Sequence, residues 1–117
     1  MAELIWQRGD IHWVEFIIPS KKSRTIQQEH PALIISNNKQ NQFSSVLTVL
    51  PITSQLDKVY PFEVLIQLEK PSKILLDQIT TIDKEYVKKR ITSLTNKEMM
   101  VVEKKLHITL ALGCWQN

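Results

Sequence analysis

Residues 8–16 read RGDIHWVEF, and the IIP that follows them completes the segment that decides how the fold begins. Residues 11–18 are rich in β-branched and aromatic side chains, which favour a pleated strand over a helix. Pro19 and the polar residues after it end the segment, because proline cannot donate a hydrogen bond to a sheet ladder. The stretch therefore predicts a first β-strand over residues 11–18.

Four further segments carry strand patterns. Residues 32–36 and 46–52 are mainly apolar, and the amide-rich residues 37–42 between them favour a turn or loop. Residues 62–68 place apolar side chains at every second position, which is the period of a strand. Residues 74–82 supply a fifth predicted strand.

A helix is predicted near the C-terminus. Thr95 is followed three residues later by Glu98, which is the pattern of a capping box at a helix start. Apolar residues then recur at helical spacing and predict a face that packs on the sheet. The predicted stripe comprises Met99, Val102, Leu106 and Leu110, broadened by Val101, Lys105, Ile108 and Leu112. Gly113 stands where a helix commonly ends. Strands followed by one helix predict an α+β, mostly β, fold.

The composition is that of one globular domain spanning residues 1–117, with 43% hydrophobic and 23% charged residues. No apolar run approaches the roughly 20 residues of a membrane span, and the start does not resemble a secretory signal, so a cytoplasmic protein is expected. Cys114 is the only cysteine, which excludes an intrachain disulfide. The net charge of +3 permits a polyanionic partner without requiring one.

Six segments resemble the MazF/PemK toxin family. They are residues 8–16, 30–37, 50–54, 60–64, 75–84 and 110–112. The resemblance implies a small SH3-like, CcdB-type barrel of about five to seven strands with a C-terminal helix. It also implies the toxin component of a type II toxin–antitoxin system, a homodimer held inactive by a MazE-like antitoxin. Such a toxin is a sequence-specific, metal-independent endoribonuclease that cleaves single-stranded RNA, mRNA included, through attack by the ribose 2′-hydroxyl.

His30 and Thr53 are the catalytic candidates that the resemblance implies. His30 directly precedes Pro31, where the family usually carries a catalytic arginine. Histidine gives and takes a proton near neutral pH, whereas arginine stays charged, so His30 could act as acid or base, or the site could be weakened. Thr53 matches the family's catalytic threonine, and its hydroxyl could donate to a phosphate oxygen or simply begin a turn with Ser54.

Residues 20–30 form a polar loop with three fixed cations, Lys21, Lys22 and Arg24. The loop could clamp a phosphate backbone or be a solvated segment. In the family it borders the RNA groove. The further RNA-binding candidates are Ser54, Gln55, Asp77, Gln78 and Thr80. The family usually has arginine where Thr80 stands, so the resemblance implies that a phosphate or base contact could be missing here.

Neither a metal site nor a cofactor is predicted, because His12 and His107 lack neighbouring Cys or His ligands and the chemistry needs no cofactor. Among the aromatic residues, Phe43 and Tyr60 lie in predicted loops. They are therefore better candidates for ligand contact than Trp13, whose strand position favours packing.

Two other functions remain open at this point. One is a non-catalytic toxin of the same fold, like the CcdB-type gyrase poisons, and the other is an inactive homologue that still binds an antitoxin. A homodimer is expected in each case, because residues 11–18 and 62–68 carry apolar side chains on both faces of their strands.

Overall fold

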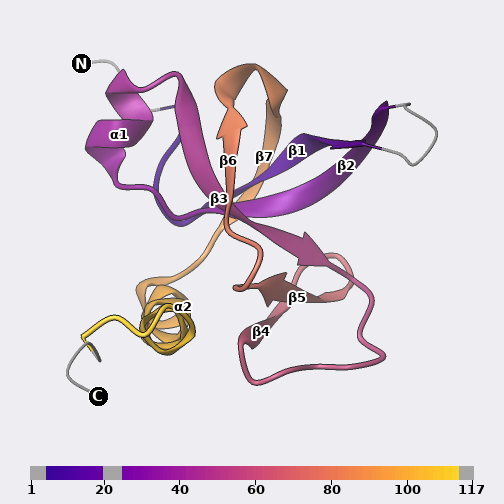
Figure 1. Ribbon diagram of the computed structural model, residues 1–117, viewed down its shortest axis with the longest axis vertical. Coiled ribbons are helices and arrows are strands. Elements are labelled where there is room, and N and C mark those ends of the chain that lie inside the picture. Colours follow the sequence, from indigo (N-terminus) through magenta and orange to yellow (C-terminus); the bar gives the residue numbers. More distant parts are fainter. Residues whose placement is uncertain (1–4, 20–24, 114–117) are drawn as a thin grey trace.

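The computed structural model of the protein describes residues 5–19 and 25–113 (Figure 1). The predictions for Lys21, Lys22, Arg24 and Cys114 lie outside these residues. The strands are β1 (Asp10–Pro19), β2 (Thr25–Ile34), β3 (Val46–Thr53), β4 (Glu63–Gln67), β5 (Pro71–Leu75), β6 (Thr80–Asp83) and β7 (Val87–Ser93). The helices are α1 (Asn38–Phe43), the 3-10 turn η1 (Lys84–Tyr86) and α2 (Asn96–Thr109). The α+β, mostly β, fold class is confirmed.

All strand pairs are antiparallel, in the order β4-β5-β3-β2-β1-β7. The central strand β3 changes partner along its length: Val49 pairs with Thr80 of β6, and Thr53 pairs with Lys73 of β5. Strands β1 and β2 form a long hairpin that projects from the body of the fold (Figure 1). Within the described residues the seven-stranded sheet is curved but open, so the expected barrel is not closed.

Both faces of the central strands are buried, which explains why their sequences are almost continuously apolar. One core cluster contains Ile11, Leu33, Leu50 and Ile52 together with Met99, Val102 and Leu106 of α2. The other contains Val14, Ala32, Ile34, Leu47, Val49 and Ile82. Successive strand residues therefore alternate between two cores, and α2 covers only one of them.

The predicted capping box begins α2: Thr95 Oγ1 accepts from the Glu98 N–H at 3.1 Å, and Glu98 Oε1 accepts from the Thr95 N–H at 2.9 Å. Of the predicted stripe only Met99, Val102 and Leu106 are buried. Leu110 and Leu112, 48% and 49% exposed, lie beyond the end of the helix at Thr109. Val101 and Ile108, 49% and 73% exposed, lie on the helix but do not face the core. The left-handed residue after the helix is Ala111, ahead of Gly113, and it closes a Schellman motif. In that motif the N–H of Leu112 donates to His107 O at 2.8 Å.

The prediction of one strand over residues 74–82 is wrong. The chain turns after Leu75, whose carbonyl accepts the Gln78 N–H at 3.2 Å, and pairing resumes at Thr80. Asp77 and Gln78 provide the polar turn. The break is needed because β5 and β6 pair with different halves of β3, and one straight strand could not serve both.

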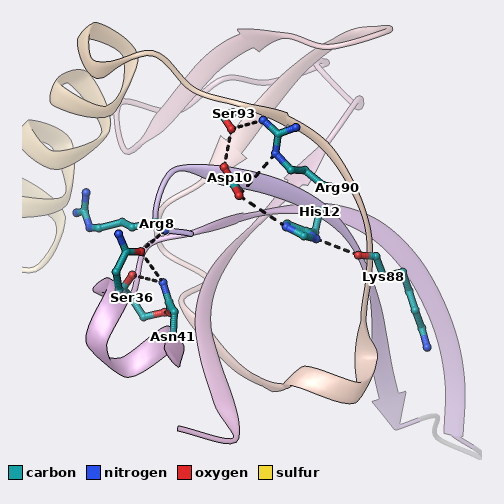
Figure 2. Close-up of polar contacts among 9 residues, drawn as sticks. Arg8, Asp10, His12, Ser36, Asn41, Lys88, Arg90 and Ser93 are labelled. Carbon is teal, nitrogen blue, oxygen red and sulfur yellow. Dashed lines mark hydrogen bonds and ion pairs between the residues drawn. The ribbon is translucent and has the colours of Figure 1, made fainter. Parts of the chain in front are cut away.

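Three other segments differ from expectation. Residues 25–30, predicted as part of a loop, continue β2. Residues 38–43 form α1, which Asn37 caps by accepting the Gln40 N–H at 2.9 Å, and Asn41 is buried against Ser36 (Figure 2). Strand β7 was not predicted, because Lys88, Lys89 and Arg90 give it the charged pattern of an edge strand.

A cluster of polar side chains joins β1 to β7 (Figure 2). The buried Asp10 accepts a hydrogen bond from Ser93 Oγ and lies 3.6 Å from Arg90 Nε. The buried His12 places Nδ1 2.9 Å from Lys88 O and Nε2 4.0 Å from Asp10 Oδ2. The cluster ties the edge strand to the sheet.

No helix among the described residues is long and apolar enough to cross a membrane.

Candidate functional site

A cavity of about 600 Å³ lies where β3 ends, between the β1–β2 hairpin, the loop after β3 and the turn after β5. Five of the predicted site residues line it: His30, Thr53, Gln55, Gln78 and Thr80. They come from β2, β3, β6 and the segments that follow β3 and β5. Strand pairing thus gathers residues that are far apart in the sequence.

A second cavity, of about 550 Å³, adjoins the first. His30, Thr53 and Gln55 line both cavities, and Ser54 lines the second only. The two catalytic candidates therefore stand where the cavities meet. Asp77 is exposed and lines neither cavity.

His30 lies on β2 opposite Val14 and is partly buried. Its Nε2 is 3.0 Å from Gln28 Oε1, and its ring centroid is 6.3 Å from that of Phe16. An amide oxygen only accepts hydrogen bonds, so Nε2 is the donor of this contact in the tautomer that carries its proton there.

Thr53 is the last residue of β3 and is partly buried. Its Oγ1 accepts a hydrogen bond from the Gln55 N–H at 3.2 Å, which is the turn contact expected of a threonine in this position. A hydroxyl that accepts in this way still has its own proton to donate. The turn role and a donor role toward a ligand are therefore compatible.

Two buried charged residues of the first cavity were missed by the sequence analysis. Lys73 Nζ lies 3.0 Å from Glu63 Oε1, and their side chains are 9% and 5% exposed. The sequence gives little sign of the pair, because Lys73 follows the mainly polar residues 69–72 and directly precedes the apolar run that begins at Ile74. The predicted strand began at residue 74 and so left Lys73 out.

The described lining of the first cavity carries two lysines and two carboxylates, which balance in charge: Lys58, Lys73, Asp57 and Glu63. The described residues contain no group of three or more His, Cys, Asp or Glu side chains that could hold a metal ion. The polar groups at the junction of the cavities are thus the imidazole of His30, the hydroxyl of Thr53 and the side-chain amide of Gln55.

Comparison with known proteins identifies the family. The sequence pattern of the PemK-like, MazF-like toxins of type II toxin–antitoxin systems matches residues 7–110, and the chain belongs to this family. The endoribonuclease EndoA of Bacillus subtilis is 35% identical over 117 residues, covering 93% of this chain and 97% of that protein. The endoribonuclease MazF of Staphylococcus saprophyticus is 38% identical over 88 residues, covering 70% of this chain and 73% of that protein.

Solved structures share the fold at lower identity. A MazE–MazF structure from Deinococcus radiodurans matches with a TM-score of 0.78 and 21% identity, covering 95% of this chain and all of that chain. A mycobacterial endoribonuclease in complex with its cognate antitoxin matches with a TM-score of 0.70 and 19% identity, covering 91% and 93% of the two chains. These likenesses establish the α+β arrangement of the family for this chain.

Proposed function

We propose that this protein is the toxin of a type II toxin–antitoxin system and that it cleaves single-stranded RNA, including mRNA, at specific sequences. One observation carries the proposal: His30 and Thr53, from different strands, both line the same two adjoining cavities in a chain of the PemK/MazF family. The relatives named endoribonuclease EndoA and MazF support the same activity.

In the proposed reaction the ribose 2′-oxygen bonds to the adjacent phosphorus while the bond from phosphorus to the 5′-oxygen breaks. The products are a 2′,3′-cyclic phosphate and a 5′-hydroxyl. The 2′-hydroxyl loses a proton, the 5′-oxygen gains one, and His30 transfers a proton in this exchange. The Thr53 hydroxyl donates to a non-bridging phosphate oxygen, where negative charge grows in the transition state. The mechanism uses no metal ion or cofactor.

Binding of the RNA backbone requires positive charge. In the described lining of the first cavity the two lysines are balanced by two carboxylates, so this lining carries no net positive charge from lysine. We assign this role to Lys21, Lys22 and Arg24 of the hairpin loop. Polar contacts to the RNA come from Ser54, Gln55, Asp77, Gln78 and Thr80. Of these, all but Asp77 line one or both cavities.

The proposed assembly is a homodimer that a MazE-like antitoxin inhibits in the cytoplasm, with residues 1–117 as one toxin domain. Large apolar side chains on α2 and β4 support an interface: Met100 is 65% exposed, Ile108 73% and Leu65 60%. The Deinococcus and mycobacterial structures contain related toxins with MazE or a cognate antitoxin, which supports the proposed inhibitor.

The test is cleavage of a long single-stranded RNA by the purified protein in the presence of EDTA, with both new RNA ends identified. The expected result is cleavage at a recurring short sequence, leaving cyclic phosphate and 5′-hydroxyl ends. Binding of the antitoxin should stop it. Antitoxin binding without any RNA cleavage would instead identify a non-catalytic or inactive toxin.

A further inference from the structure

The loop between β3 and β4, residues 54–62, forms one wall of the first cavity, and Lys58 and Tyr60 of this loop line it. Two backbone groups of the loop are tied to buried side chains. Glu63 Oε1 accepts the N–H of Tyr60 at 2.8 Å, and Lys73 Nζ donates to the carbonyl of Lys58. The same two side chains pair with each other at 3.0 Å. The loop is thus held by a buried ion pair that is anchored in β4 and β5.

A buried ion pair is a costly way to stabilise a fold, because both charges lose their hydration. Apolar side chains of similar volume often stabilise such a position as well or better. What an apolar pair cannot do is hold the polar backbone of a loop in one place. Lys73 donates a hydrogen bond to the carbonyl of Lys58, and Glu63 accepts one from the N–H of Tyr60, so the pair fixes the backbone of this loop.

The positioned side chain is Tyr60. Its ring is stacked on Phe62 with an interplanar angle of 3° and a centroid distance of 5.3 Å, and Lys73 Nζ lies 5.9 Å from its centroid. The backbone closes a turn here, because the Glu63 N–H donates to Tyr60 O at 3.0 Å across Pro61. Nevertheless 46% of Tyr60 is exposed, in a cavity that it shares with His30 and Thr53.

We propose that Tyr60 is the contact for a nucleobase adjacent to the cleaved phosphate, and that the Lys73–Glu63 pair is the positioning element that holds it there. This inference rests on the proposed RNA cleavage. An aromatic ring accepts the face of any base, so the contact strengthens RNA binding without selecting base identity. Lys73 and Glu63 act through Tyr60 and do not touch the reacting atoms.

The test is an abasic scan of a short single-stranded RNA that the wild type cleaves. Removal of one base at a time should raise KM most at a single position beside the cleavage site, by about 5- to 100-fold, with kcat little changed. In Tyr60→Ala the KM for intact RNA should rise by a similar factor, and removal of the same base should then have no further effect. Tyr60→Phe should retain the wild-type profile. An unchanged abasic profile in Tyr60→Ala overturns the proposal.

The role of the ion pair is tested in the double variant Lys73→Met/Glu63→Leu, which replaces both charges by apolar groups of similar size. We expect this double variant to melt near the wild-type temperature. Its KM values across the abasic RNA series should nevertheless match those of Tyr60→Ala. Retention of the wild-type profile would contradict the positioning role. Hydrogen exchange at the Tyr60 amide gives a test in the wild type itself: the amide should exchange slowly, and exchange at the rate of an unstructured chain would also contradict it.

The scan distinguishes this inference from the proposed function. Intact RNA that remains uncleaved by the wild type overturns the proposed function. The same abasic series is then measured as binding affinity by fluorescence anisotropy, where a single position sensitive to Tyr60→Ala supports the nucleobase contact and a flat series overturns it. If the wild type cleaves intact RNA but the abasic profile is the same in Tyr60→Ala, only the proposed contact between Tyr60 and a nucleobase is overturned.

Discussion

Two histidines on neighbouring strands occupy contrasting surroundings. His12 on β1 is 3% exposed, with Nδ1 facing Lys88 O and Nε2 facing Asp10, and it belongs to a polar cluster that joins β1 to β7 (Figure 2). His30 on β2 is partly buried, borders two cavities, and has Gln28 and Phe16 as neighbours. The residue type is the same, but only one of the two rings is accessible to a ligand.

These surroundings decide which of the two polar groups is available for chemistry. A buried histidine whose nitrogens face protein groups holds strands together, and its loss is measured as lost stability. A histidine at a cavity can exchange protons with a bound substrate, and its loss is measured as lost rate. The predicted effects of single substitutions separate these two roles.

The largest effect is expected for His30→Ala, because a positioned acid or base contributes roughly 10²- to 10⁴-fold to a rate. The rate of RNA cleavage should decrease by a factor in that range, while the melting temperature changes little. The matched control is His12→Ala, which should cleave at nearly the wild-type rate per folded molecule. Equal loss of rate in both variants would remove the distinction between the two histidines.

Thr53→Ala should lower kcat by about tenfold or more, because the hydroxyl is proposed to act on the transition state. Thr53→Ser keeps the hydroxyl and serves as the control, with most of the activity retained. Single-turnover cleavage and thermal melting are measured on both. Parallel loss of activity and stability in Thr53→Ala would assign the residue to the turn with Gln55 alone.

Replacement of Lys21, Lys22 and Arg24 by Ala should weaken RNA binding and flatten its dependence on salt. Each phosphate contact to single-stranded RNA contributes a slope of about 0.7 in log K against log salt, so the slope should fall by about 2. Ala at Lys97 and Lys104, exposed on α2, provides the control. A slope that the triple variant shares with the wild type would place the phosphate contacts elsewhere.

The smallest expected effect concerns stability alone. His12→Ala should lower the free energy of unfolding by about 1–3 kcal/mol, because Lys88 O and Asp10 lose a buried neighbour. Urea denaturation of wild type and variant measures it. A variant as stable as the wild type would show that the β1–β7 cluster does not need His12.

The parts of the fold that follow from local chemistry were predictable. The capping box of Thr95 and Glu98 locates α2, and the apolar runs locate the central strands. Features set by distant residues were not. The apolar pattern of residues 74–82 hides the turn at Asp77, because only pairing with β3 reveals that two strands are required.

The candidate site shows the same division. The family resemblance supplied His30 and Thr53, and the structure brings both to one cavity junction. The Lys73–Glu63 pair was not predictable, because two charges ten residues apart in the sequence become partners only when β4 and β5 pair. The register of these strands decides which side chains meet.

Proton transfer by His30 during RNA cleavage can be tested directly with pH–rate profiles. Rates for the wild type and His30→Arg are compared from about pH 5 to about pH 9 on one single-stranded RNA. Proton transfer by His30 predicts a rate that depends on pH in the wild type and a dependence that is absent in His30→Arg, since guanidinium keeps its proton throughout. Superimposable profiles, or a slow wild type whose activity His30→Arg restores at every pH, would contradict it.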